Sequence, residues 1–360
     1  MESRLNSEDE NDNISKNSDS NGSSNLNESE SNNSNENDWN LDIKTEEKFL
    51  IKLIEDNYFY KPDICPCCNK GLYIIKKYKK PDIINIFFCE CNNKICRKKV
   101  QLRNYSIFKI CKNIPASVFF KILEWFFQHE KNATKIIELI KDKFQKIISI
   151  KTITKILHKI RIIIYLHMKK KYESTLIGGF NHLNKSRIVA IDECLIGHNK
   201  NGEQIWLIGG IETKEKRMRL MLSKVRNAVT LEKFVNENFY EGTHFTHDGW
   251  NGYIFLDNNI SFTHEEHLHG GGDFGYGSYS TSHIEGLWNY IKKIFIRIYY
   301  IMPRFHLLLY LREIEFRINI SQGDFNNTKK ILKEILYEIY ILNKYEFSDD
   351  ILEEEEIILL

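Results

Sequence analysis

The sequence has no long run of apolar residues. Its longest uninterrupted runs, such as Ile162–Leu166, fall far short of the ~20 residues that a membrane helix needs. The N-terminus is polar and acidic, and it has no apolar stretch of the kind found in signal peptides. We therefore expect an intracellular chain, in which the eight cysteines serve as metal ligands or free thiols rather than as disulfides.

Acidic residues are scarce in the middle of the chain. Residues 1–42 and 346–360 hold 18 of the 49 acidic residues but only two of the 51 basic ones. Residues 43–345 therefore carry 49 basic and 31 acidic residues, a net charge of +18. A body this basic favours a polyanionic partner, most simply nucleic acid. The alternative explanation is a Lys-, Ile- and Asn-rich composition that reflects AT-rich coding DNA.

Composition and periodicity divide the 360 residues into unlike segments. The first 44 residues contain twelve Asn and ten Ser, so they bury too little apolar surface to offset the entropy of ordering. A hydrophobic content of 42% allows the rest to form a core. The expected segments are a disordered acidic tail (1–44), a cysteine-rich segment (45–104), a helical segment (105–178), an α/β segment (179–322), and a helix followed by an acidic tail (323–360).

The cysteines are paired along the sequence. A C-x-x-C knuckle is followed, after 22 residues, by a second pair with four residues between its members. The candidate ligands are Cys65, Cys68, Cys91 and Cys96. Two thiolate pairs on two turns can close a tetrahedral zinc site, and four thiolates leave no open position for water. We predict a structural zinc ribbon, with Cys67 and Cys89 as alternative ligands.

Basic residues follow the cysteines and line a predicted pair of helices. Arg97 and Lys98 come directly after the last ribbon cysteine. A helix at Ala133–Phe144, capped by Asn132, and another from about Ile150 resemble a helix-turn-helix. The second helix would carry the phosphate-contacting residues Lys151, Lys155, Lys159 and Arg161. The alternatives are a nuclear-import patch, solvated lysines and the ordinary packing of a helical bundle.

Three carboxylates lie on predicted strands and a helix of the α/β segment. Asp192 ends a strand at Ile188–Asp192, Asp248 follows a strand at Thr243–His247, and Glu285 lies in a helix. The order of three strands, a helix, a strand and a helix is that of a ribonuclease-H-like domain, with the two aspartates adjacent in the sheet. Converging carboxylates repel one another unless cations lie between them. Two Mg²⁺ or Mn²⁺ ions would fit these oxygen ligands.

Other polar residues surround these acids in the sequence. Lys292 follows Glu285 by two helical turns, so both face the same side, where the lysine would hold a DNA phosphate. The alternative is an ordinary exposed helix lysine. His264, His267 and His269 could form a further metal site, or His269 could shape the rim of the carboxylate site.

At these residues the sequence resembles DNA transposases of the Merlin superfamily and their bacterial insertion-sequence relatives. The matching pieces, in order, are Cys91…Cys96-Arg-Lys-Lys, Ala190-Ile-Asp-Glu193, Trp206-Leu-Ile-Gly-Gly-Ile211, His247-Asp-Gly-Trp250 with Tyr253, His269 leading into Phe274, Ser282-His-Ile-Glu-Gly-Leu-Trp288 with Lys292, and Tyr310–Asn319. The sequence departs at Ser282, where the family usually has Asn, and at Gly249, where an acidic residue often stands.

The resemblance implies a DDE transposase whose metal-binding acids are Asp192, Asp248 and Glu285. It implies Mg²⁺-dependent cleavage at transposon ends and strand transfer into target DNA. The ribbon and helices would recognise terminal inverted repeats, and a homo-oligomer would pair two ends. The alternatives are a host-adopted, non-catalytic DNA-binding regulator and a cellular nuclease of the same fold. We expect the nucleus in a eukaryote, which the acidic tail favours, and the cytoplasm in a bacterium.

Overall fold

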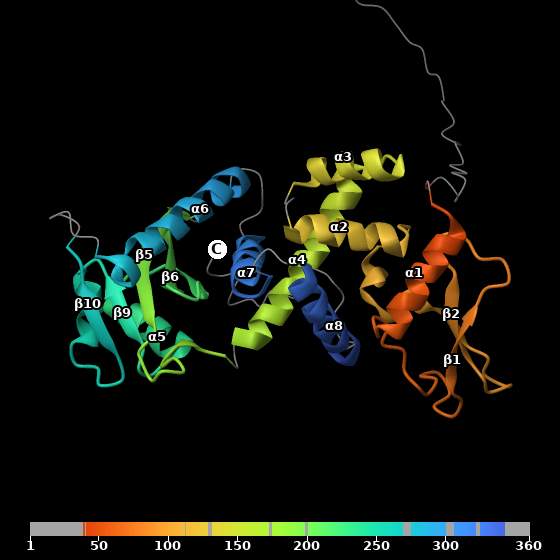
Figure 1. Cartoon of the computed structure of the whole chain (residues 1–360), viewed down its shortest axis with the longest axis horizontal. Helices are drawn as coiled ribbons and strands as arrows, with labels where there is room; N and C mark the ends of the chain where they lie inside the picture. Colours follow the sequence, from red (N-terminus) through yellow and green to blue (C-terminus); the bar gives the residue numbers. More distant parts are fainter. Residues whose placement is uncertain are drawn as a thin grey trace, which may run out of the picture. The chain divides into compact units, whose positions relative to one another are not determined.

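The computed structural model describes residues 39, 41–111, 113–128, 132–172, 175–198, 201–268, 275–299, 306–321 and 325–342 (Figure 1). Most of the tail predicted to be disordered, the acidic C-terminus and His269 lie outside these residues. The described residues all belong to one unit, Glu36–Leu360. No helix among them combines the length and apolar character that crossing a membrane requires.

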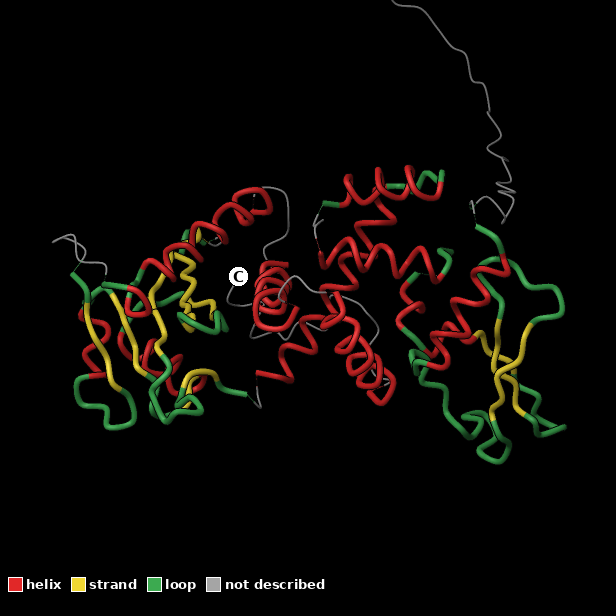
Figure 2. Tube along the Cα trace, viewed as in Figure 1, coloured by secondary structure: helices red, strands yellow, loops and turns green. Residues whose placement is uncertain are grey.

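A helix and a small sheet form the cysteine-rich segment. Helix α1 (Ile43–Glu55) begins after Asp42, whose carboxylate accepts a hydrogen bond from the Thr45 N–H. This helix was not predicted. The three antiparallel strands, yellow in Figure 2, pair in sequence order: β1 (Tyr73–Lys77), β2 (Phe87–Cys91) and β3 (Lys99–Gln101).

The next segment, predicted to be helical, forms helices as far as Tyr172 among its described residues and ends in the short strand β4 (Ile177–Gly178). Its elements are η1 (Leu102–Tyr105), η2 (Ile107–Ile110), α2 (Ala116–Gln128), α3 (Ala133–Phe144) and α4 (Ile150–Tyr172). Helix α3 has the predicted bounds and cap, since the Asn132 side chain accepts a hydrogen bond from the Thr134 N–H. Apolar residues of α2, α3 and α4 share one core.

Five strands form the larger sheet, in the order β10-β9-β5-β6-β7. Their bounds are β5 (Ile188–His198), β6 (Gln204–Glu212), β7 (Met218–Ser223), β9 (His244–His247) and β10 (Thr263–Glu266). Strand β6 pairs antiparallel with β5 and β7, whereas β9 runs parallel to both β5 and β10. This is a ribonuclease-H-like sheet, the predicted fold class. Strand β10 was missed because its Thr-His-Glu-Glu sequence has no apolar residue and lies at the sheet edge.

Helices cover both faces of this sheet (Figure 1). Side chains of β5 alternate between the faces: Ala190 and Cys194 pack with Trp288 of helix α6, whereas Val189 and Ile191 pack with helix α5. The remaining elements are β4 (Ile177–Gly178), α5 (Ala228–Asn238), β8 (Phe239–Tyr240), η3 (Asn251–Leu256), η5 (Gly277–Tyr279), α6 (Ser282–Tyr299), α7 (Leu307–Phe316), the π-helical turn η7 (Arg317–Ser321) and α8 (Phe325–Leu342).

Two adjacent glycines in β6 allow this close covering. A Cβ atom at Gly209 would lie 2.5 Å from Cη2 of Trp288 on one face. A Cβ atom at Gly210 would lie 2.6 Å from Cζ of Phe239 on the other. Both distances are shorter than Cβ contacts in real proteins. Trp288 and Phe239 can therefore pack this closely only because both positions are glycine. Gly209 pairs with Asp192 in the sheet, and its missing side chain leaves room for the indole beside that aspartate.

A buried carboxylate joins helices α4 and α7. Oε2 of Glu313 lies 2.6 Å from Nε of Arg161, and Oε1 lies 2.7 Å from Nε of Arg317. The prediction that Arg161 contacts phosphate was wrong, because its side chain is buried against Glu313. Two residues correspond to about 200° around a helix, so Arg161 faces away from the side that carries Lys159.

We expect Glu313→Gln to lower the free energy of unfolding at pH 7 by about 3–5 kcal/mol, because it leaves buried guanidinium charge uncompensated. Burial opposes ionisation of Glu313, but Arg161 and Arg317 outweigh it and lower its pKa to about 2. This stabilisation is therefore complete above the ordinary pKa of 4.5 and is lost as the pH falls towards 2.

Urea unfolding of the variant at pH 7 and pH 3 measures both effects. Wild type should lose stability over this range, and the variant should lose less. The control is Glu138→Gln, an exposed carboxylate paired with Lys135, whose effect should stay below about 0.5 kcal/mol. Equal pH dependence in wild type and Glu313→Gln would contradict the assignment.

Candidate functional site

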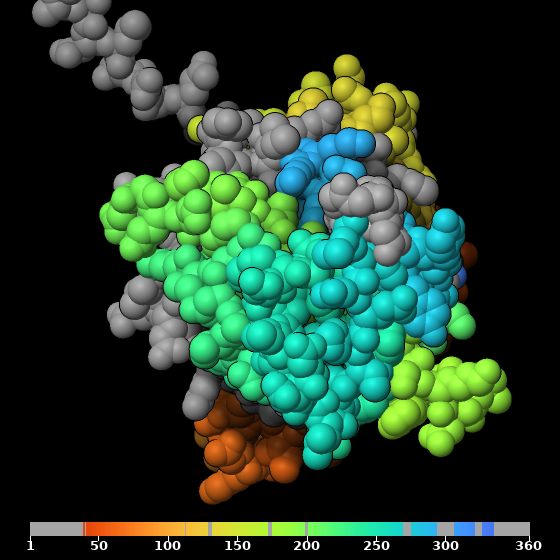
Figure 3. All heavy atoms as spheres, turned by 90° about the vertical axis from the view of Figure 1, so that its left-hand side faces the viewer, coloured from red at the N-terminus to blue at the C-terminus, as the bar shows by residue number. Residues whose placement is uncertain are grey.

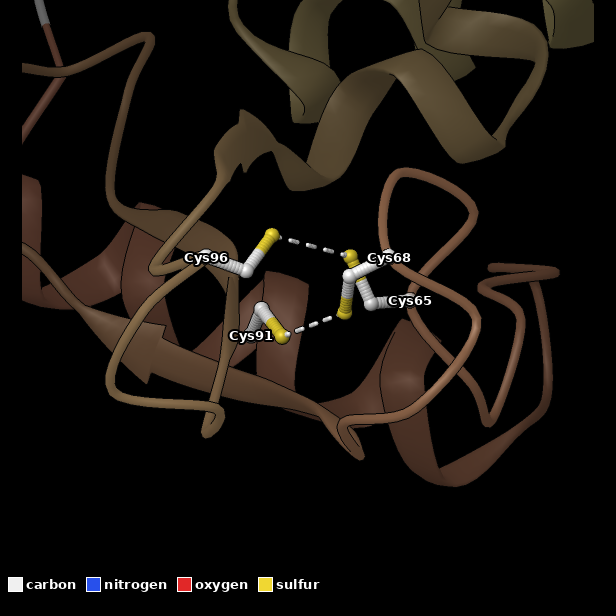
Figure 4. A group of neighbouring side chains, drawn as sticks. All are labelled: Cys65, Cys68, Cys91 and Cys96. Atoms are coloured by element: carbon white, nitrogen blue, oxygen red, sulfur yellow. Dashed lines mark hydrogen bonds between the residues drawn. The ribbon is translucent and has the colours of Figure 1, made fainter.

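Four cysteines of the ribbon gather their sulfur atoms within 4.8 Å of one another (Figure 4). Sγ of Cys65 lies 3.8 Å from Sγ of Cys96, and Sγ of Cys68 lies 3.6 Å from Sγ of Cys91. A tetrahedral zinc site with Zn–S bonds of about 2.3 Å has S···S edges of about 3.8 Å. A disulfide would bring the sulfur atoms to about 2.0 Å. The spacing therefore fits four thiolates around one zinc ion.

The backbone around these cysteines leaves room for a sulfur atom and stabilises the negative charge of a thiolate. A Cβ atom at Gly71 would lie 2.5 Å from Sγ of Cys91, so the turn accommodates the sulfur only with glycine there. Backbone N–H groups of Lys70 and Gly71 lower the pKa of Cys68 to about 6. Burial and the neighbouring thiols raise the pKa of Cys91. Thiols this close cannot all ionise without a cation between them.

The other candidates from the sequence lie elsewhere in the ribbon. Cys67 is exposed, whereas Cys89 is buried in the ribbon core, where burial raises its pKa to about 11. Neither belongs to the four-sulfur group. Arg97 and Lys98 are exposed in the turn after Cys96, and their contact with DNA stays a prediction.

The predicted phosphate-contacting lysines of α4 are available to a partner to different degrees. Lys151 and Lys155 are exposed, and Lys159 is partly exposed. Their spacing of four residues places all three on one side of the helix. Their contact with DNA also stays a prediction.

The two aspartates lie on neighbouring parallel strands. Ala190 of β5 pairs with Thr246 of β9, so two residues further along both chains Asp192 comes beside Asp248. The prediction that Asp192 ends its strand was wrong, because β5 continues to His198 in an antiparallel ladder with β6. Asp192 thus stands where the pairing with β9 ends and the pairing with β6 continues.

The electrostatics of Asp192 favour a bound cation. Burial raises its pKa to about 6, and the charge of Asp248 acts in the same direction. The indole Nε1–H of Trp288 opposes this by donating a hydrogen bond of 2.8 Å to Oδ2 of Asp192. A partly buried carboxylate beside a second one is a ligand pair that a hard divalent cation would stabilise.

Helix α6 brings its polar residues to the same side of the sheet. Glu285, Trp288 and Lys292 are spaced by three and four residues and therefore share one helix face. Trp288 reaches Asp192, and Lys292 approaches Cys194, where it opposes the effect of burial on the thiol pKa. Glu285 precedes Trp288 by one turn on this face.

The three carboxylates are spread more widely than the cysteines. Within the described part of the chain, only the four cysteines form a group whose ligand atoms all lie within 4.8 Å. Two ions about 3.5–4 Å apart need a broader set of ligands than one ion does. Asp192, Asp248 and Glu285 are oxygen donors of the type that hard divalent ions prefer, and their joint binding of two ions stays a prediction.

Behind the aspartates, Glu193 points to the opposite face, as strand alternation predicts. Its Oε1 accepts a hydrogen bond of 2.5 Å from Oη of Tyr253, and its Oε2 lies 2.9 Å from Nε of Arg226. Burial raises its pKa to about 7. The Arg226 guanidinium lies 3.9 Å from the ring centroid of Trp250. The partners Tyr253 and Arg226 were not predicted, since neither is near Glu193 in the sequence.

The alternative of a further histidine metal site does not fit the described histidines. Nδ1 of His264 lies 3.0 Å from Nε2 of His247, and its Nε2 lies 3.0 Å from Oδ1 of Asp257. Both ring nitrogens of His264 therefore face protein partners. His267 directly follows β10 and donates its backbone N–H to the carbonyl of His247, and no group of metal ligands around it emerges from the described residues.

Comparison with known proteins finds a match for the segment that contains the larger sheet. Residues 167–319 match the ISXO2-like transposase domain, and no curated protein matches the chain. A solved structure, the cryo-EM structure of a simian T-cell lymphotropic virus intasome in complex with the PP2A regulatory subunit B56 gamma, contains a chain that is 13% identical, with a TM-score of 0.26. That similarity covers 53% of this chain and 66% of the other. The matched segment is similar to a DDE transposase domain; it contains the ribonuclease-H-like sheet and follows helices and a four-cysteine cluster.

We expect Cys65→Ser to abolish zinc binding and to unfold the ribbon, because structural zinc contributes about 10–16 kcal/mol of apparent binding free energy in zinc-finger peptides. Metal analysis of the purified protein measures the loss, and circular dichroism measures the unfolding. Cys67→Ser, at an exposed cysteine outside the cluster, is the matched control and should retain one zinc ion. Retention of zinc by Cys65→Ser would refute the assigned cluster.

We expect Trp288→Phe to raise the pKa of Asp192 above its value of about 6, because the substitution removes the hydrogen bond that lowers it. Carboxyl ¹³C NMR of the metal-free protein measures this titration. Mn²⁺ binding should then require a higher pH, since the ion binds the deprotonated form. Trp125→Phe, in the separate helical core, should leave the titration unchanged. A fall in the Asp192 pKa would contradict the role of the indole.

Proposed function

We propose that this chain is a DNA transposase of the Merlin superfamily, which cleaves DNA at transposon ends and joins them to target DNA. The observation that carries the proposal is the placement of Asp192 beside Asp248, facing the helix that bears Glu285. The domain match over residues 167–319 supports the same reading. The strand register of the two aspartates and the helix face shared by Glu285 and Trp288 support the proposal.

The three carboxylates would hold two Mg²⁺ or Mn²⁺ ions, which supply Lewis acidity and lower the pKa of a bound water. Trp288 orients Asp192 through its indole N–H. Lys292, two turns after Glu285, would neutralise a phosphate of the bound strand. Water would attack the phosphodiester at the transposon end, releasing a 3′-hydroxyl. That hydroxyl would then attack a target phosphodiester and displace the 3′-oxygen of the target strand.

The remaining segments would supply recognition. The ribbon, with Arg97 and Lys98, and helix α4, with Lys151, Lys155 and Lys159, would bind the terminal inverted repeats. The net charge of +18 in residues 43–345 supports a polyanionic partner. Pairing of two ends would require a homo-oligomer. We place the protein in the nucleus if its source is eukaryotic and in the cytoplasm if it is bacterial.

We expect the full chain to nick supercoiled DNA in the presence of Mg²⁺, and Asp192→Asn and Asp248→Asn to reduce nicking by more than about 100-fold. Loss of residues that only orient metal ligands already costs about 10–100-fold. Nicked plasmid is quantified on agarose gels. Asp142→Asn, at an exposed carboxylate of α3, should match wild type.

Strand-transfer assays separate the proposal from its rivals. A DNA fragment that carries the inverted repeats flanking the gene serves as donor, and a plasmid serves as target. Joined products that depend on Asp192 and Asp248 support a transposase. Nicking without joining would favour a cellular nuclease. DNA binding without nicking would favour the non-catalytic regulator.

A further inference from the structure

A chain of hydrogen-bonded side chains runs from the surface to the backbone next to Asp248. Oδ1 of Asp257 lies 3.0 Å from Nε2 of His264, and Nδ1 of His264 lies 3.0 Å from Nε2 of His247. Nδ1 of His247 lies 3.1 Å from the backbone nitrogen of Gly249. The Asp257 side chain is 56% exposed, whereas His247 is 2% exposed. In Figure 3 residues around 250–265 lie on the face turned to the viewer.

The backbone end of this chain determines where each proton lies. The Gly249 N–H can only donate, so Nδ1 of His247 accepts, and the neutral ring carries its proton on Nε2. Nε2–H of His247 then donates to Nδ1 of His264. His264 in turn carries its proton on Nε2 and donates to the carboxylate of Asp257. Each ring nitrogen either donates or accepts a hydrogen bond, so this series of hydrogen bonds selects one tautomer of each ring.

His247 holds the turn that presents Asp248. Gly249 has a φ of +74°, a left-handed conformation that favours glycine. Two hydrogen bonds hold this turn: the one from Gly249 N–H to His247, and one of 3.0 Å from Trp250 N–H to Oδ1 of Asp248. The imidazole therefore acts on the residue that follows the aspartate, not on the carboxylate itself.

The same ring also connects to the strand of Asp192. His247 stacks on Tyr253 with ring centroids 4.4 Å apart and an interplanar angle of 24°. Oη of Tyr253 donates to Glu193, the residue directly after Asp192. His247 thus contacts, directly or through Tyr253, the residues that follow both aspartates. A displacement of the ring would change the position of one carboxylate relative to the other.

We propose that His247 is a positioning residue that sets the geometry of Asp192 and Asp248 for divalent-cation binding, and that His264 and Asp257 hold it in the required tautomer. This inference rests on the proposed function, because it assumes that the two aspartates bind the ions. His247 touches no substrate in this role. Its acceptor atom Nδ1 is the essential one, since that atom holds the Gly249 N–H.

Two near-isosteric variants separate the ring's two hydrogen bonds. In His247→Asn the amide oxygen takes the place of Nδ1, so the acceptor for Gly249 is kept and the donor to His264 is lost. In His247→Gln the amide nitrogen takes the place of Nε2, so the donor is kept and the acceptor is lost. Both variants lose the aromatic ring and its stacking on Tyr253. A purely structural role would therefore affect them alike.

The readout is Mn²⁺ affinity of the full chain without DNA, measured by isothermal titration calorimetry well below each variant's Tm. We expect His247→Asn to bind within about 3-fold of wild type, and His247→Gln to bind about 10–100-fold more weakly, the range seen for partners of metal ligands. Equal affinities in the two variants, whether both weak or both like wild type, would overturn the inference.

Imidazole ¹⁵N NMR of wild type gives a second, activity-independent readout. The neutral rings of His247 and His264 should both carry their proton on Nε2. In Asp257→Ala the His264 ring loses the acceptor of its Nε2–H, but His247 still donates to its Nδ1, so the Nε2–H tautomer should still predominate. The Nδ1–H tautomer of His247 in wild type would overturn the inference.

Asp248→Asn distinguishes failure of the inference from failure of the proposed function. If wild type binds Mn²⁺, Asp248→Asn abolishes binding and the two His247 variants behave alike, the inference alone fails. If wild type binds no Mn²⁺, or if Asp248→Asn binds it as tightly as wild type does, the proposed function fails and the positioning role fails with it.

Discussion

The parallel pairing of β5 with β9 is the interaction on which the candidate site depends. It sets Ala190 beside Thr246 and thereby places Asp192 level with Asp248. A slip of one residue would turn every side chain of a strand to the other face, and Asp192 would change places with Glu193. The apolar neighbours Val189 and Ile191, packed against α5 on the opposite face, oppose such a slip.

Buried carboxylates in this protein are compensated in two different ways. Glu313 is paired with guanidinium groups of the chain itself, and its pKa is low. Burial and the charge of Asp248 raise the pKa of Asp192, and the hydrogen bonds from Trp288 and the Glu193 backbone do not offset them. The first arrangement stabilises the fold with groups of the chain itself, whereas the second leaves two carboxylates beside each other, which a cation would stabilise.

Much of the fold could be predicted from the sequence, because its elements carry local signals. The apolar strand around Ala190 and the cap at Asn132 are examples. The cysteine spacing likewise predicted a zinc site, and the four sulfur atoms lie close together in the structure. What could not be predicted depends on partners distant in sequence: the burial of Arg161 against Glu313, and the contact between Glu193 and Tyr253. Strand β10 gave no signal because an edge strand can be wholly polar.

The ion pair between Arg161 and Glu313 also determines where the chain can be divided. Arg161 precedes both the matched segment, which begins at residue 167, and the predicted boundary at residue 179. A fragment cut at either point would keep Glu313 on α7 but would lose Arg161, one of its two cationic partners. A buried ion pair therefore links helix α4 to the domain that carries the sheet and its acids. The helix proposed to bind DNA and the sheet proposed to cut it belong to the same compact unit.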